Sequence, residues 1–243
     1  MKFSPHALFV LLLLPLFGFA QDTQIVTQES ISRLAYLNPG GPGFSTFSTV
    51  DRTEGTPYLR DDWQMGQIRF EGQTNFSEDL ELLMDLENSH LYIRLSSGFS
   101  GEFPLERLNE VRVFTEEADT LSYETMNLYN LFGAGPRITQ FYRVLYRSEQ
   151  YLMLHHPSKY LRREEYIENL GMVRRPDKYM DQNDYWLYNG ETVVEVKRKS
   201  RSLEEALPSR SRDLRGLIRE NNLDLDNDAD LARLFSLLEN VEN

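Results

Sequence analysis

Between residue 66 and residue 196, apolar and polar residues alternate at a period of two, and this pattern limits the fold more than any other feature of the chain. Side chains of a β-strand point alternately to its two faces, so the alternation predicts strands with one buried face. The expected strands lie at 80–86, 91–95, 111–113, 141–146, 151–156, 185–188 and 191–196. Short turns join them and no long helical pattern intervenes, which favours an antiparallel meander over a parallel sheet.

One turn between these strands carries a specific signature. Asn189-Gly190 separates two apolar-polar runs. Asn-Gly is typical of a type I′ turn, in which both central residues have positive φ. We therefore expect a tight hairpin at Gly190.

The last forty residues change to a helical period. Ser202 and Glu205 form a capping-box pattern, and Pro208 ends that helix. Two apolar stripes follow, the first at Leu214, Leu217 and Ile218, the second at Leu231, Leu234, Phe235 and Leu238. Asp228 or Asp226 is expected to cap the last helix. Helices this short are unstable alone, so they should pack on the sheet. The predicted class is α+β, with a curved antiparallel meander (61–200) and short amphipathic C-terminal helices (201–243) in one domain.

The first twenty residues have the pattern of a secretory signal peptide. Lys2 precedes an apolar run at 7–17, and the small residues Gly18 and Ala20 predict cleavage between Ala20 and Gln21. The run is shorter than the ~20 residues that span a bilayer, and no later segment is long enough. Residues 21–60 then form an extended segment with a Pro/Gly cluster at 38–43. We expect an exported protein, periplasmic or extracellular.

Composition excludes several classes. The chain has no cysteine, which rules out a disulfide scaffold, cysteine-ligated metals, a thiol nucleophile and a lipidated cysteine. Its 38 acidic residues against 26 basic ones give a net charge of −12. That balance argues against nucleic acid as a partner. An exported chain without disulfides must be stabilised by its core.

The layout resembles a broad group of uncharacterised secreted proteins of Bacteroidota. The resemblance rests on the run 55–59, on Asp62-Trp63 and Gly66, on the aromatic run 185–188, and on the apolar C-terminal helices. It covers most of the chain, and its motifs are short and mainly structural. It implies an envelope location and the α+β fold, and it implies no catalytic residue and no cofactor.

Histidines and aspartates are the candidate metal ligands. Outside the signal peptide the histidines are His90, His155 and His156. Neighbouring residues of a strand face opposite sides, so His155 and His156 would bind one metal only in a loop, and the alternative is a pair of edge or loop histidines. Asp224, Asp226 and Asp228 resemble the opening of a calcium loop. That loop requires a glycine at its sixth position and a glutamate at its twelfth, where this chain has Ala229 and Phe235, so capping of the last helix explains the acids better.

Other charged and aromatic residues are candidates for catalytic or binding sites. Carboxylate pairs occur at 116–117 and 204–205, and no Gly-x-Ser-x-Gly nucleophile motif is present. The basic run 197–199 with Arg201, and the smaller runs 162–163 and 174–175, suit anionic headgroups or an acidic glycan, or form solvated surface. Trp63 and Trp186 suit stacking on a sugar, or sheet packing.

Three functions follow, in order of preference. The absence of a catalytic motif favours a non-catalytic interaction protein of the envelope, with a protein, lipid or glycan partner. The alternative is a carrier of an apolar, lipid-like ligand between sheet and helices. The second alternative is a hydrolase of cell-wall or extracellular polymers. No metal, cofactor or catalytic residue is assigned.

Overall fold

The computed structural model describes residues 27, 31, 53–98, 100–115, 119–163, 165–167 and 172–241. The predicted signal peptide, its cleavage site at Ala20 and Gln21, and most of the segment 21–60 lie outside these residues. Within the described ranges, no helix is long and apolar enough to cross a bilayer.

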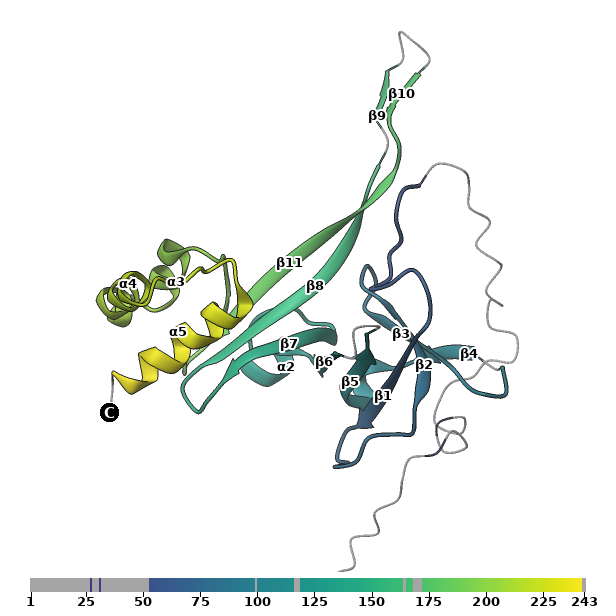
Figure 1. Ribbon diagram of the computed structural model, residues 1–243, viewed down its shortest axis with the longest axis horizontal. Helices are drawn as coiled ribbons and strands as arrows, with labels where there is room; N and C mark the ends of the chain where they lie inside the picture. Colours follow the sequence, from purple (N-terminus) through teal and green to yellow (C-terminus); the bar gives the residue numbers. More distant parts are fainter. Residues whose placement is uncertain are drawn as a thin grey trace, which may run out of the picture.

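An antiparallel sheet of ten strands and four α-helices make up the described part of the chain, which confirms the predicted α+β class (Figure 1). The strands are β1 (Gln64–Phe70), β2 (Leu80–Asp85), β3 (His90–Arg94), β4 (Ser100–Phe103), β5 (Leu108–Phe114), β6 (Thr120–Met126), β7 (Gln140–Arg147), β8 (Leu152–Arg162), β11 (Lys178–Tyr188) and β12 (Val193–Val196). Their spatial order is β12-β11-β8-β7-β6-β5-β1-β2-β3-β4. A separate hairpin, β9 (Glu165–Ile167) and β10 (Met172–Arg175), connects β8 to β11.

The strand order departs from a simple meander at β1. After β4 the chain passes through the 3-10 helix η1 (Leu105–Arg107), and β5 then returns to pair with β1. β1 therefore lies between β2 and β5. These strands curve around one apolar core with the following fully buried members: Ile68, Leu80, Leu82, Leu91, Ile93, Phe103 and Val111.

The segment 53–59 links this N-terminal half to β11. Glu54 donates its backbone N–H to the Asp177 carbonyl at 2.8 Å, and its carbonyl accepts from Tyr179 at 2.9 Å. Further along, the carbonyl of Pro57 accepts from the backbone N–H of Leu86 at 2.9 Å. The run 55–59, which carries part of the family resemblance, thus has a structural role between the two halves of the sheet.

The C-terminal helices cover one face of β7, β8, β11 and β12, called the helical face below (Figure 1). They are α3 (Ser200–Ala206), α4 (Ser211–Glu220) and α5 (Asp228–Asn240), with the 3-10 turn η3 (Pro208–Arg210) between the first two. The two predicted apolar stripes lie on α4 and α5. The stripe of α5 packs against the sheet at β7 as expected, whereas α4 packs mainly on α3 and α5. On the opposite face, the short α2 (Leu128–Phe132) packs through Phe132, whose ring stacks on Tyr188 with centroids 4.7 Å apart.

Two predicted helix starts are wrong. α3 begins at Ser200, and the Ser202 hydroxyl accepts from the backbone N–H of Lys197, so it holds the preceding strand end and does not cap the helix. Neither Asp228 nor Asp226 caps α5. The side chain of Asn227 does so, accepting from the N–H groups of the second and third residues that follow it, at 2.8 and 3.3 Å.

The β11–β12 hairpin is confirmed, but its predicted type I′ turn is wrong. Tyr188 pairs with Val193, which leaves a connection of four residues, 189–192. Gly190 has a φ of 90°, whereas Asn189 is not among the described residues with positive φ. The Asn189 side chain instead accepts from the N–H groups of Glu191 and Thr192, at 3.2 and 3.0 Å. Asparagine thus closes this turn through its side chain.

Candidate functional site

β8 carries His155 and His156 at the centre of the sheet, on opposite faces, as the strand geometry predicts. Both are buried, at 7% and 4% exposure, so the expectation of edge or loop histidines is wrong. His155 is paired with Arg143 of β7 and Tyr185 of β11, which makes this part of β8 an inner strand. The two imidazoles therefore belong to two separate polar groups.

On the helical face, His155 belongs to a cluster at the first residue of α5, called the Asp228 cluster. Its members are Arg143, His155, Asn183, Tyr185, Arg198 and Asp228. The Asp228 carboxylate accepts from Arg143 Nη1 at 3.1 Å and from the Tyr185 hydroxyl at 3.3 Å. His155 Nδ1 lies 3.8 Å from Asp228 Oδ2, and its Nε2 lies 2.7 Å from Asn183 Oδ1.

The electrostatics of the Asp228 cluster favour an anchoring role. Burial lowers the pKa of His155, against the opposing effects of Asn183 and Asp228. Burial, followed by the charge of Asp228, raises the pKa of Tyr185 to about 12. Two arginines balance the Asp228 carboxylate, because Arg198 Nη1 also lies 3.6 Å from Oδ1. The cluster therefore holds the start of α5 on the sheet, and it explains why Asp228 faces inward instead of capping the helix.

On the opposite face, His156 lines a hollow of about 290 Å³, called the His156 hollow. β8 and β11 contribute part of its lining, while the turn 86–89 and the connection 136–140 contribute the rest. Its polar and aromatic lining includes Glu87, Gln140, His156, Gln182, Asp184 and Trp186. The hollow thus joins residues from four segments of the chain.

The His156 hollow offers hydrogen-bond acceptors. His156 Nδ1 lies 2.8 Å from the Phe141 carbonyl, which can only accept, so Nδ1 carries the proton. Burial lowers the pKa of His156, so the ring is neutral near pH 7 and Nε2 is an acceptor. Both oxygens of Asp184 accept from Gln182 Nε2 at 3.0 Å, and Glu87 accepts from the Tyr179 hydroxyl. Since a neighbour holds each carboxylate, the arrangement favours binding over acid–base chemistry.

The two buried histidines make stability depend on pH. Their pKa values are lowered by burial in the folded protein, while an unfolded histidine titrates near 6.5. Below about pH 6.5 the unfolded chain binds protons that the folded protein does not, so the free energy of unfolding should fall as pH falls. We expect the urea midpoint to decrease from pH 7.5 to pH 5.5. His156→Gln should make this decrease smaller, and a midpoint that does not change over this range would contradict the assignment.

The other predicted site residues do not converge on a centre. His90 Nδ1 lies 3.7 Å from Glu102 at the surface, and the Trp63 ring lies under Arg94 at 4.7 Å. Glu204 and Glu205 pair with arginines, and 116–117 lie outside the described residues. Among the residues that the structure places, no three His, Asp or Glu side chains are grouped to hold a metal ion.

The space between the helical face and the C-terminal helices is occupied by side chains. The fully buried ones on the helices are Leu203, Leu214, Leu231, Leu234, Phe235 and Leu238. From the sheet, Met153 and Leu187 meet them, both at 0% exposure, and the Phe235 ring packs near Tyr146 and Tyr151. This interface is therefore a packed core, which gives the carrier alternative no support.

One part of the sheet is a two-stranded ribbon, residues 156–162 of β8 paired with 178–184 of β11, which extends beyond the neighbouring strands. β8 pairs with β7 only as far as His155, and β11 pairs with β12 only from Tyr185 onward. Pro157 lies two residues after His155. It has no backbone N–H to donate to β7, which explains why the β7–β8 pairing ends at this point. In Figure 1 the ribbon projects from the body of the molecule and continues into β9 and β10.

The sequence pointed to Asp228, His156 and Trp186 one by one, but it did not predict the Asp228 cluster, the His156 hollow or the ribbon. Comparisons with protein-family models, with curated proteins and with solved structures found no match. The functional argument therefore rests on the geometry of these three features.

Proposed function

We propose that the protein is a non-catalytic interaction protein of the cell envelope, and that the ribbon is the element that contacts its partner, a second envelope protein. The observation that carries this proposal is the free outer edge of the ribbon. Glu54 bridges to Lys178, and β12 pairs with β11 from Tyr185 onward. Between them, in the described part of the chain, residues 181–184 of β11 have no strand neighbour on that side.

A free edge is suited to binding another chain. Its backbone N–H and C=O groups can pair with an added strand, and neighbouring side chains give specificity. Asp181, Gln182 and Asn183 are exposed beside this edge. Tyr160, on the paired strand, is 46% exposed, and tyrosine is enriched at protein interfaces. The His156 hollow lies at the base of the ribbon and supplies acceptors for a donor group of the partner.

Native mass spectrometry of the protein purified gently from its own envelope tests this proposal. The test variant is Asp181→Pro. The N–H of Tyr179 donates to the Glu54 carbonyl on the outer side of β11, so the N–H of Asp181, two residues further on, faces the same side, and proline removes it. We expect the unaltered protein in a larger assembly and the variant as a monomer. Thermal unfolding should be nearly the same for both, because Asp181 is exposed and belongs to none of the apolar cores.

Three results would contradict the proposal. If the protein purified from the envelope is a monomer without any bound molecule, it has no stable partner protein there. An assembly that survives in the variant would move the contact away from the free edge of the ribbon. An adduct of lipid mass retained by a monomer would favour the carrier alternative instead.

A further inference from the structure

The charges of this chain are distributed unevenly along its length. Residues 197–220, which form α3, α4 and their connections, contain eight Lys and Arg against four Asp and Glu. The remainder therefore holds 18 basic residues of the 26 and 34 acidic residues of the 38. A segment with excess positive charge thus stands out in a protein that is otherwise strongly acidic.

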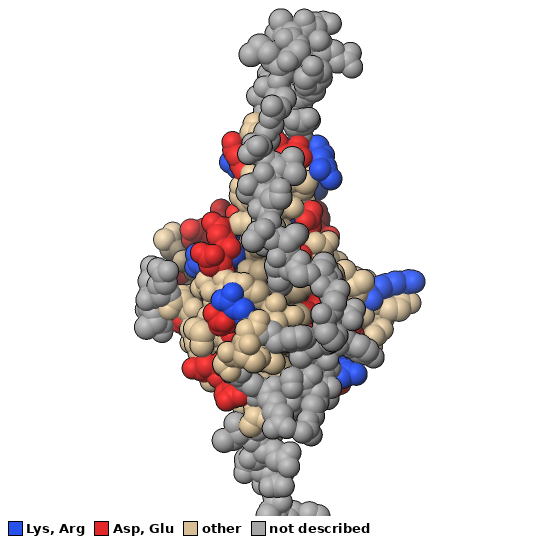
Figure 2. All heavy atoms as spheres, turned by 90° about the vertical axis from the view of Figure 1, so that its right-hand side faces the viewer, with Lys and Arg blue, Asp and Glu red and all other residues tan. Residues whose placement is uncertain are grey.

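The half of the sheet away from the C-terminal helices carries an excess of negative charge. Residues 53–115 contain twelve Asp and Glu against five Arg. Acidic side chains are spread over the face of this half that is drawn in Figure 2. α3 and α4 lie at the other end of the sheet, beyond β7 and β8 (Figure 1). The basic charge of the helical end is therefore confined to α3, α4 and their connections, since residues 221–241, which include α5, hold five Asp and Glu against one Arg.

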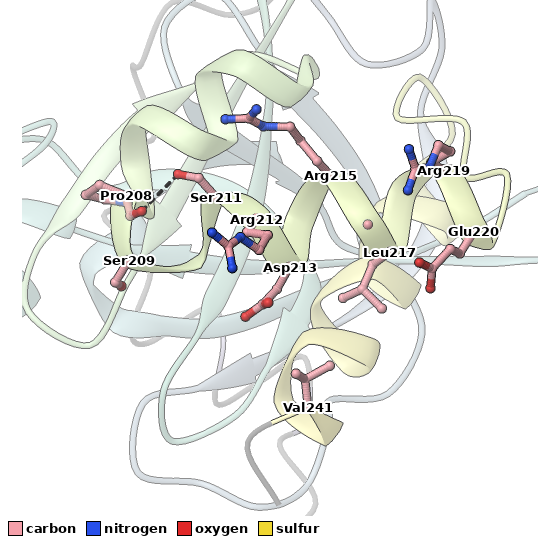
Figure 3. A pocket seen from close by; sticks show the side chains of 11 residues that line it. Pro208, Ser209, Ser211, Arg212, Asp213, Arg215, Leu217, Arg219, Glu220 and Val241 are labelled. Atoms are coloured by element: carbon pink, nitrogen blue, oxygen red, sulfur yellow. Dashed lines mark hydrogen bonds between the residues drawn. The ribbon is translucent and has the colours of Figure 1, made fainter.

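On α4 the basic residues share one side of the helix. Arg212, Arg215 and Arg219 are spaced three and four residues apart, and all are exposed, while Leu214 of the same helix is buried. They line a broad hollow of about 1010 Å³ between α4 and the end of α5, where Val241 is 54% exposed (Figure 3). We call the side formed by these three arginines the basic face.

Two arginines of the basic face are available to a partner. Arg215 is bonded to Glu204 at 2.9 Å, whereas Arg212 and Arg219 have no ion pair within the described residues. Asp213 also lines the hollow, but Arg210 holds its carboxylate at 3.0 Å. Glu220 is the remaining acid there. The excess positive charge of the segment is thus carried at the surface.

We infer that the basic face docks the protein on an anionic phospholipid surface, independently of the ribbon. Residues 197–220 contain no aromatic residue, whereas the energetic centres of protein–protein interfaces are enriched in Trp and Tyr. Exposed arginines around a broad hollow can contact several phosphate headgroups at once, whereas a protein partner would need a deep pocket for an anchoring side chain. The acidic half of the sheet is repelled by the same surface, which orients the molecule with α3 and α4 toward the lipid.

Sedimentation with vesicles of phosphatidylcholine alone, or of phosphatidylcholine and phosphatidylglycerol at seven to three, tests this inference. We expect binding to the anionic vesicles alone at 50 mM NaCl, and its loss at 500 mM NaCl. Arg212→Gln with Arg219→Gln should weaken binding about thirtyfold, since each basic residue near an anionic surface contributes about fivefold. Arg212→Lys with Arg219→Lys should retain it.

The matched control is Arg60→Gln with Arg137→Gln, which changes the net charge equally but lies outside residues 197–220. It should leave binding within twofold of the unaltered protein. Equal weakening in both glutamine pairs, binding to both kinds of vesicle, or no binding to anionic vesicles at 50 mM NaCl would each overturn the inference. Displacement by 10 mM inorganic phosphate beyond that by chloride of equal ionic strength would also overturn it, because the site would then bind free phosphate.

Discussion

Removing residues 203–243 should convert the protein into an aggregating species. The deletion takes away the six fully buried apolar side chains that the helices contribute to the core. At about 1.5–3 kcal/mol for each buried side chain, the loss is on the order of 10 kcal/mol. That is comparable with the whole free energy of unfolding of a typical domain. Size-exclusion chromatography with light scattering should show large particles, and a dye that binds apolar surface should fluoresce.

Two point variants on α5 accompany this deletion: one tests the same interface on a smaller scale, and the other is its matched control. Phe235→Ala removes one fully buried ring and should lower the free energy of unfolding by about 3–5 kcal/mol. Ser236→Ala, at the neighbouring exposed position, should change it by less than about 0.5 kcal/mol. A truncated chain that stays monomeric with an unchanged melting temperature would mean that the helices form an independent tail.

Local periodicity was sufficient to predict much of the sheet. The predicted runs at 80–86, 91–95 and 141–146 lie on β2, β3 and β7. The alternation is clearest in β3, where Leu91 and Ile93 face the core and the residues between them do not. The two apolar stripes of the C-terminal helices are visible in the sequence for the same reason. Where one face of an element is buried and the other is exposed, the sequence repeats at the period of that element.

Periodicity fails where an element is polar on both faces. The prediction ended one strand at residue 156, but β8 continues to Arg162 because its partner β11 is equally long. Neither face of the ribbon belongs to an apolar core, so its sequence does not alternate between apolar and polar residues. β6 was missed as well, although the buried Tyr123 and Met126 lie on it.

The candidate site depends on contacts between distant residues. Asp228 lies 85 positions from Arg143, its partner in the Asp228 cluster. The sequence alone suggests a helix cap or a calcium ligand for Asp228, because only residues close to it in the sequence can be considered as its partners. The same limit applies to the histidines. Strand geometry correctly predicts that His155 and His156 lie on opposite faces of the sheet. Their burial, however, depends on the neighbouring strands β7 and β11, which the local sequence does not specify.

Gly66→Ala should be among the most destabilising single substitutions in the N-terminal half. Gly66 lies on β1, where it pairs with Val113 of β5 and Leu80 of β2. A Cβ atom at this position would lie 2.1 Å from the Arg112 carbonyl oxygen and 2.7 Å from Leu82 Cδ1. The first contact is to backbone, so β1 and β5 must separate to admit a methyl group. Overpacking of this kind should lower the free energy of unfolding by about 3 kcal/mol.

Urea unfolding followed by tryptophan fluorescence measures this loss, since Trp63 directly precedes β1. Gly216→Ala on α4 is the matched control, because the nearest atom to its added Cβ would be 3.8 Å away. Replacing this half-buried helical glycine by alanine should raise the free energy of unfolding by up to about 1 kcal/mol, since the added methyl group has room. The same chemical change should therefore have opposite signs at the two positions. A Gly66→Ala variant as stable as the unaltered protein would show that β1 and β5 can move apart freely, and the close approach would then not explain the glycine.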